Sequence, residues 1–207
     1  STHLTGADVG TMLRDYPFEG VLLGYSAMNF SIRDKGIDAA YDLNRGVVVM
    51  NPLGGGIIPQ NPEMFSFIKS HKDETVVEGA LRFLINDSRI TVALVGFSSQ
   101  RELDEALHAV NGFKPISPEK IRDMRAHIKE AFNAMCTGCQ YCDECPEDVP
   151  VPKMMDAYNQ IMLAKDGKAM FDRLRWHWGL APDDPAFTAC TACGNCESLC
   201  TQKLPII

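Results

Sequence analysis

The sequence predicts an α/β fold with a parallel sheet in residues 1–115, followed by a mostly helical, cysteine-rich region in residues 116–207. The first region alternates short, nearly continuous apolar segments with stretches of helical character. This alternation is typical of parallel strands that are buried on both faces and joined by helices. The second region holds all eight cysteines of the chain, in two short runs.

Three segments of the first region are expected to form strands, because they are short, apolar and rich in leucine or β-branched residues. They read "EGVLLGY" (19–25), "GVVVM" (46–50) and "ITVALVG" (90–96). Helices are expected around them at 6–15, 35–44, 62–70, 75–86 and 99–110. No G-x-G-x-x-G motif follows a strand, so the sequence does not indicate a Rossmann dinucleotide site.

The second region is expected to begin with a helix. Ser117 is a suitable N-cap, and Pro118 fits the first helical position, where its missing N–H is not needed. This helix should run to the first cysteine, Cys136. Two further helices are expected between the cysteine runs, at about 152–165 and 168–179.

The composition excludes several classes of protein. The chain has 207 residues, 45% of them hydrophobic, and a formal net charge of −7 with a pI of about 5.2. An acidic chain is a poor general binder of nucleic acid or of anionic membranes, since both need a positive surface. No apolar run approaches the roughly 20 residues of a membrane-spanning helix. With no signal peptide visible, we expect a cytoplasmic protein, and the missing initiator methionine suggests a processed chain or a piece of a longer one.

The two cysteine runs predict two [4Fe–4S] clusters. They read "CTGCQYCDEC" (136–145) and "CTACGNCESLC" (190–200). The second run has the C-x2-C-x2-C-x3-C spacing of bacterial ferredoxins, and the first is one residue shorter at its last step. Structural zinc is an alternative, but zinc usually takes two well-separated C-x2-C pairs. A disulfide framework is a further alternative, typical of short secreted chains.

The ferredoxin rule also predicts which cysteines share a cluster, because the fourth cysteine of each run binds the cluster of the other run. One cluster would be held by Cys136, Cys139, Cys142 and Cys200. The other would be held by Cys190, Cys193, Cys196 and Cys145. Pro146 follows the first run, as in ferredoxins, whereas Thr201 stands at that place after the second run.

Two loops of the first region could bind a phosphate group. "NPLGGG" (51–56) follows the second strand, and its glycines would let backbone N–H groups approach a ligand. "GFSSQRELDEAL" (96–107) follows the third strand, and Ser99 with Glu102 forms a capping-box pattern that opens a helix. The alternatives are a flexible turn in the first case and a plain helix cap in the second.

These segments, together with "GYSAMNFS", "ALRFLINDSRITVALVGFSSQRELDEAL" and the cysteine runs, resemble the branch of the aldo/keto reductase family that carries a C-terminal ferredoxin-like extension. The resemblance implies the C-terminal part of a (β/α)8 TIM barrel and a site for NADP(H) or NAD(H). Ser1 and Thr2 would lie by the nicotinamide. The residues implied for the pyrophosphate are Asn51, Leu53, Gly54, Gly55 and Gly56, and those for the adenosine end are Gly96, Ser98, Ser99, Arg101 and Glu105.

The chain departs from the family in two ways. Gly96 stands where many members carry a basic residue for the 2′-phosphate, and Glu102 stands at a usual arginine position, so the choice between NAD and NADP stays open. The family's catalytic Asp, Tyr, Lys and His lie in sequence that would precede residue 1. We therefore assign no catalytic residue and expect this chain alone not to reduce carbonyls. The expected partners are the N-terminal half of the barrel or a second copy of the chain, and a redox partner protein.

Three functions remain open on the sequence. The first is the C-terminal part of a nicotinamide-dependent oxidoreductase that passes electrons through its clusters. The second is a ferredoxin-like electron-transfer and binding module on an inactive barrel scaffold. The third is a structural zinc module.

Overall fold

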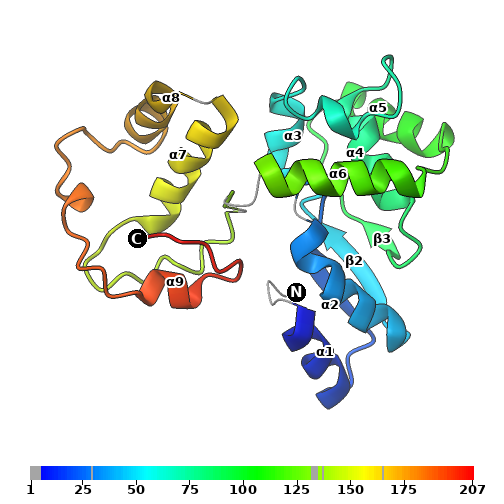
Figure 1. The fold of residues 1–207 in the computed structure, drawn as a ribbon, viewed down its shortest axis with the longest axis horizontal. Coiled ribbons are helices and arrows are strands. Elements are labelled where there is room, and N and C mark those ends of the chain that lie inside the picture. The colour runs from blue at the N-terminus through cyan, green and yellow to red at the C-terminus, as the bar shows by residue number, and fades with distance from the viewer. Residues whose placement is uncertain (1–5, 29, 132–134, 137, 165) are drawn as a thin grey trace. The chain divides into compact units, whose positions relative to one another are not determined.

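The computed structural model describes residues 6–28, 30–131, 135–136, 138–164 and 166–207. The chain divides into two compact units, Ser1–Ala131 and Phe132–Ile207, which are described separately below (Figure 1). The expected division at residues 115 and 116 placed the helix after Ser117 in the second unit. Its contacts place it in the first. The boundary between domains of the protein stays a prediction.

A parallel sheet of three strands lies in the first unit. The strands β1 (Gly20–Gly24), β2 (Gly46–Met50) and β3 (Val92–Ala93) pair in the order β1-β2-β3. Gly20 is in register with Gly46, and Val48 with Val92. The described strands therefore form an open sheet with two edges, which does not close into a barrel.

The helices expected at 6–15, 75–86 and 99–110 agree closely with the structure, whereas the one expected at 35–44 begins earlier, at Phe30, and the short helix Ile57–Gln60 matches no expected helix. The helices of the first unit are α1 (Gly6–Asp15), α2 (Phe30–Asp42), α3 (Ile57–Gln60), α4 (Val76–Ile85), α5 (Gln100–Asn111) and α6 (Pro118–Ala131). The helix expected over 62–70 is wrong: this segment forms turns and the short 3-10 helix η2 (Ser66–Ile68). Its hydrogen bonds span three residues, which brings the buried side chains of Phe65 and Ile68 to one side.

The sheet is buried on one face rather than two. Val47 and Val49 are fully buried, whereas Val48 between them is half-buried. Successive side chains of a strand point to opposite faces, so one face of β2 packs on the core and the other is partly open. The expectation of strands buried on both faces is wrong for the described residues, because the described helices do not fully cover the second face.

An aromatic cluster joins the sheet to two helices. Tyr25 follows β1, Phe30 opens α2, and Phe83 lies on α4. The ring centroids of Phe30 and Phe83 are 4.9 Å apart, and those of Tyr25 and Phe83 are 5.8 Å apart. The guanidinium of Arg125 on α6 lies 4.7 Å from the ring centroid of Phe30. These contacts explain why α6 belongs to the first unit.

The second unit contains a helical pair followed by short elements. Its helices are α7 (Val151–Ala164), α8 (Gly167–Asp172), a π-helical turn η3 (Arg173–His177), the 3-10 helix η4 (Pro185–Phe187) and α9 (Asn195–Leu199). Asp156 on α7 accepts hydrogen bonds of 2.7 Å from both Arg173 Nε and Trp178 Nε1, which holds η3 against α7. Trp176 is 74% exposed, whereas Trp178 is half-buried. No helix in the described ranges is long and apolar enough to cross a membrane.

A charged network links α2 to the residue after β1 and to the segment after α4. Arg89 donates to Asp87 at 2.6 and 2.8 Å and to Asp34 at 3.2 Å. The buried Tyr25 hydroxyl lies 3.2 Å from Asp87 and 3.3 Å from Asp34. Burial and both carboxylates raise the pKa of Tyr25, so it stays a neutral donor. Burial alone would raise the pKa of Asp87, but its hydrogen bonds from Arg89 outweigh burial and lower it.

The lowered pKa of Asp87 predicts an acid-sensitive first unit. Because the folded pKa lies below the usual 3.8, the ionised carboxylate stabilises the fold above that pH, and this contribution is lost as pH falls through the folded pKa. We expect Asp87→Asn to cost about 1–2 kcal/mol at pH 6 and to lose less stability than the parent between pH 6 and pH 3. Urea unfolding, followed through hydrogen exchange of peptides from 76–93, measures both. Asp42→Asn, at an exposed position, is the control, and an unchanged pH dependence in Asp87→Asn would contradict the argument.

Candidate metal centres

The first group of thiols combines three cysteines of the first run with the last cysteine of the second. Cys142 and Cys200 are both buried in one apolar cluster with Val149, Met155 and Leu204. Burial raises the pKa of Cys142 to about 11, and the thiols of Cys136, Cys139 and Cys200 contribute to this rise. Cys136 packs against the same cluster, and the sulfur of Cys139 lies 3.7 Å from the hydroxyl oxygen of Thr201, the residue after Cys200. Cys145 and Cys196 also pack against this cluster.

Neighbouring residues fix the loop that carries these thiols. Asn159 on α7 is buried and bonds both backbone groups of Cys136, accepting from its N–H at 2.9 Å and donating to its carbonyl at 2.8 Å. Gln202 donates to the carbonyl of Met135 at 3.1 Å, which ties the second run to the start of the first. These hydrogen bonds hold the loop independently of any bound cluster.

The second group of thiols surrounds a cavity of about 670 Å³. Its wall includes Cys145 from the first run and Cys190, Cys193 and Cys196 from the second. The remaining wall is largely apolar and comes from α7, the α8–η3 segment, η4 and the residues after α9. Asn195 donates to the carbonyl of Glu144 at 2.7 Å, which holds the two runs together beside this cavity.

The two groups differ in their exposure to solvent. Cys142 and Cys200 of the first group are buried, whereas Cys190 and Cys193 of the second are exposed. Burial raises the pKa of Cys136 and of Cys196 as well as that of Cys142. These thiols are therefore protonated at neutral pH without a ligand, and they release protons when they bind a metal.

Two kinds of metal site take four cysteine ligands. Zinc needs four ligands around a single ion, each at roughly 2.3 Å for a thiolate. Among the described residues, which include all eight cysteines, no three potential ligands converge closely enough on one point to hold a single ion. A [4Fe–4S] cluster binds each cysteine through a different iron atom, so its four thiolates stand further apart. The eight thiols of the chain are the number of donors that two such clusters require.

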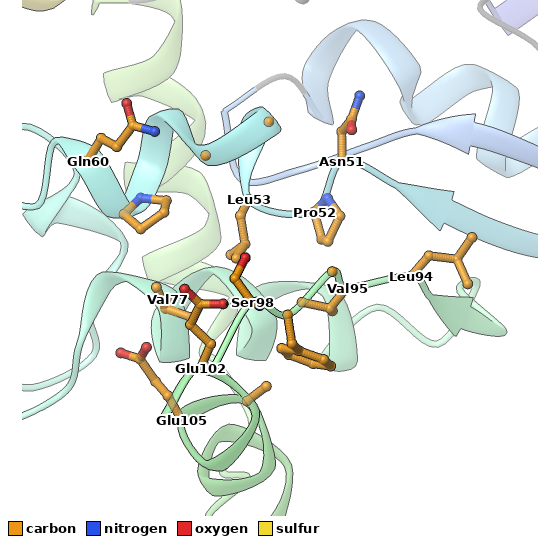
Figure 2. A pocket seen from close by; sticks show the side chains of 16 residues that line it. Asn51, Pro52, Leu53, Gln60, Val77, Leu94, Val95, Ser98, Glu102 and Glu105 are labelled. Carbon is orange, nitrogen blue, oxygen red and sulfur yellow. Dashed lines mark hydrogen bonds between the residues drawn. The ribbon is translucent and has the colours of Figure 1, made fainter. Parts of the chain in front are cut away.

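A separate cavity of about 550 Å³ lies in the first unit (Figure 2). It is bounded by the loop after β2, the segment after β3 and the start of α5. Seven residues that the resemblance implied for nucleotide binding line it: Asn51, Leu53, Gly55, Gly56, Gly96, Ser98 and Glu105. Gly54, Ser99 and Arg101 do not line the cavity, and Ser1 and Thr2 lie outside the described residues.

The glycine loop presents fewer free N–H groups than the sequence suggested. Gly54, Gly55 and Gly56 all have positive φ, a conformation that favours glycine. The Gly54 N–H donates to the carbonyl of Asn51 at 2.9 Å, and the Gly56 N–H to that of Leu53 at 3.2 Å. The loop is therefore a structured turn, and a Cβ at Gly55 would meet nothing within 4 Å.

The start of α5 brings two carboxylates to the cavity. Ser99 caps the helix by accepting from the Glu102 N–H at 3.3 Å, as its sequence predicts. In a full capping box the Glu102 carboxylate would accept from the Ser99 N–H, but here it accepts from the Ser98 N–H at 2.6 Å. Figure 2 shows Glu102 and Glu105 side by side on α5, with the Asn51 amide pointing away from them.

Sequence reasoning did not assign several residues of this cavity wall. They are Pro52, Pro59, Gln60, Val77, Leu94, Val95, Phe97, Glu102 and Ala106. Glu102 was considered only as a capping residue and as a replacement for arginine. Val95 and Phe97 flank Gly96 in the sequence and could have been found from that position. Val77 comes from α4, and no local pattern marks it.

Comparison with known proteins agrees with the cysteine-rich part of this picture. Residues 135–204 match the family described as a 4Fe-4S dicluster domain. No curated protein matches the chain. The match begins just before Cys136 and ends just after Cys200, so it includes all eight cysteines. The second unit thus contains a 4Fe-4S dicluster domain, which suggests a role in electron transfer.

Proposed function

We propose that the chain is the C-terminal part of an oxidoreductase whose second unit carries electrons through two [4Fe–4S] clusters. One observation carries this proposal: Cys200 is buried in one cluster with Cys142 of the first run, and Cys145 lines a cavity with Cys190, Cys193 and Cys196 of the second. Each cluster, when bound, takes up or releases one electron at a time. The residues of the chain supply the thiolates, exclude water from the buried set and keep both sets within one unit.

The proposed ligand sets are those expected from the ferredoxin rule. Cys136, Cys139, Cys142 and Cys200 would hold the first cluster, called the enclosed cluster here. Cys145, Cys190, Cys193 and Cys196 would hold the second, called the exposed cluster. Because two of its four thiols are exposed, the second cluster is the better placed to exchange electrons with a redox partner protein.

We further propose that the cavity of the first unit binds a nicotinamide nucleotide, as the resemblance to aldo/keto reductases implies. The cavity is large enough for part of such a ligand, and seven of the implied residues line it. Glu102 and Glu105 are the charged residues of its wall. A carboxylate can accept a hydrogen bond from the ribose 2′-hydroxyl of NAD, whereas it repels the 2′-phosphate of NADP. The cavity therefore favours NAD(H).

The open edges of the sheet support the proposal that another chain binds the first unit. β1 and β3 each have an unpaired edge in the described residues, and strands with free edges tend to pair with another chain. Val92, Leu94 and Phe97 beside the β3 edge are 45%, 48% and 44% exposed. We propose that the N-terminal half of a barrel covers this region, with a second copy of the chain as the alternative. A sedimentation measurement that finds a monomer at high concentration would contradict pairing with a second copy.

The cluster proposal predicts the metal content of the chain. Purified without oxygen, it should contain about eight irons and eight acid-labile sulfides, because each [4Fe–4S] cluster holds four of each. Iron and sulfide assays with a visible spectrum test this. Stoichiometric zinc without labile sulfide would favour the structural zinc module instead.

The crossed ligand sets predict an unequal effect of Cys145→Ser. This substitution removes a ligand of the exposed cluster although it lies in the first run. We expect the exposed cluster to be lost or changed while the enclosed cluster keeps its spectrum. The matched variant Cys200→Ser should do the reverse. Electron paramagnetic resonance of the reduced proteins separates the two clusters, and damage confined to the enclosed cluster in Cys145→Ser would refute the crossed sets.

The two carboxylates predict a preference between nucleotides. We expect the chain to bind NADH more tightly than NADPH, and the double variant Glu102→Gln, Glu105→Gln to narrow the difference by improving NADPH binding. Titration calorimetry measures both affinities, and Glu119→Gln on α6 is the control. Tighter NADPH binding by the parent would contradict the preference. Absence of binding to either nucleotide would overturn the nucleotide site and leave the cluster proposal intact.

A further inference from the structure

Thr201 contacts the enclosed set of thiols from outside that set. Its hydroxyl oxygen lies 3.7 Å from the sulfur of Cys139, within hydrogen-bonding distance for sulfur. Other hydrogen bonds to cysteine sulfurs come from backbone N–H groups, with Gly138 donating to Cys136, Leu204 to Cys200 and Ala192 to Cys190, each at 3.4 Å. Among the hydrogen bonds that the structure describes, the one to Cys139 is distinctive because a side chain makes it.

The direction of this hydrogen bond follows from the state of the sulfur. A cysteine that binds iron does so as a thiolate and carries no proton. The sulfur of Cys139 is then only an acceptor, so the Thr201 hydroxyl must donate. Thr201 is half-buried, and a hydrogen bond to a charged acceptor is stronger away from water than at an open surface.

The corresponding place at the other thiol set holds a different residue. Thr201 follows Cys200, the last cysteine of its run, and lies beside Cys139, the second cysteine of the other run. Pro146 follows Cys145 in the same way and lines a shallow opening together with Cys193, again the second cysteine of the other run. Proline has no N–H and no hydroxyl. The residue after the last cysteine therefore donates a hydrogen bond to the enclosed set of thiols, through Thr201, and none to the exposed set, where it is Pro146.

We propose that Thr201 raises the reduction potential of the enclosed cluster through its hydrogen bond to Cys139. This inference rests on the proposal that the chain holds two [4Fe–4S] clusters. Reduction adds one negative charge, part of which resides on the ligating sulfurs. A donor pointed at such a sulfur stabilises the more negative state, and hydrogen bonds to the sulfurs are among the factors that set cluster potentials.

The hydrogen bond opposes the effect of burial. Cys142 and Cys200 are buried against apolar side chains, and an apolar environment disfavours the added charge of the reduced cluster. The exposed cluster, with Cys190 and Cys193 open to solvent, does not carry that penalty to the same degree. Thr201 therefore brings the potential of the enclosed cluster closer to that of the exposed one, which keeps electron exchange between them from becoming strongly one-sided.

The test compares Thr201→Val with the parent chain. Valine has nearly the same shape as threonine but no hydroxyl, so it removes the donor with little change in packing. Iron and labile sulfide are measured first, to show that both clusters are present, and the two midpoint potentials are then found by anaerobic redox titration with electron paramagnetic resonance. We expect one potential to shift to a more negative value and the other to stay. The one that shifts should belong to the cluster that Cys139→Ser perturbs and Cys193→Ser does not.

Two further variants and a second measurement complete the test. Thr201→Ser keeps a hydroxyl and should restore the parent potential, and Thr188→Val removes a hydroxyl that bonds the carbonyl of Pro185 and should change nothing. If Thr201→Val loses its clusters, resonance Raman spectra of the parent in H2O and D2O still test the bond, because an O–H donor makes an iron–sulfur stretch sensitive to deuterium. Equal potentials in Thr201→Val and the parent, or no deuterium effect, would overturn the inference. A parent chain without labile sulfide would overturn the two-cluster proposal together with it.

Discussion

The geometry of three thiols on one short loop governs the second unit. Cysteines two residues apart reach a cluster from one side only, so each proposed cluster needs a fourth thiolate from another part of the chain. Cys200 is buried beside Cys142 of the first run, and Cys145 lines a cavity with three cysteines of the second, so each is placed to supply the fourth ligand that we propose. The segment between the two runs, which includes α7 and α8, must therefore fold back so that the last cysteine of each run can reach the other run.

The meeting of cysteines from both runs also determines what stabilises this unit. Its apolar cluster contains Cys142 and Cys200 themselves beside Val149, Val151, Met155 and Leu204. Two of the six buried residues of this cluster are cysteines, so few other side chains form the core. Small domains commonly depend on metals for stability. Folding of the unit and binding of its clusters are thus expected to be strongly coupled. The contacts of Asn159 and Gln202 with residues 135 and 136 give the loop some order of its own.

Sequence reasoning succeeded where a local pattern determines the structure. The strands around Leu22 and Val48 and the Ser99 cap follow from apolar runs and capping chemistry, whereas only Val92–Ala93 of the strand expected over 90–96 pairs in the sheet. It failed at 62–70, where helical composition yields to a 3-10 turn that buries Phe65 and Ile68. The cavity of the first unit could be predicted only in part, because the reach of Val77 from α4 and the turn that ties up the Gly54 and Gly56 amides depend on tertiary structure.

Burial also links cofactor binding to protons. The pKa of Cys142 rises to about 11 in the absence of a ligand, and burial raises those of Cys136 and Cys196 as well. Each of these thiols must lose its proton before it can bind iron, so cluster binding strengthens as pH rises toward the thiol pKa. The burial that disfavours bare thiolates also keeps water from the assembled ligands of the enclosed set. A hydroxyl donor such as Thr201 offsets part of this cost, since it stabilises the thiolate in both the assembly and the reduction of the cluster.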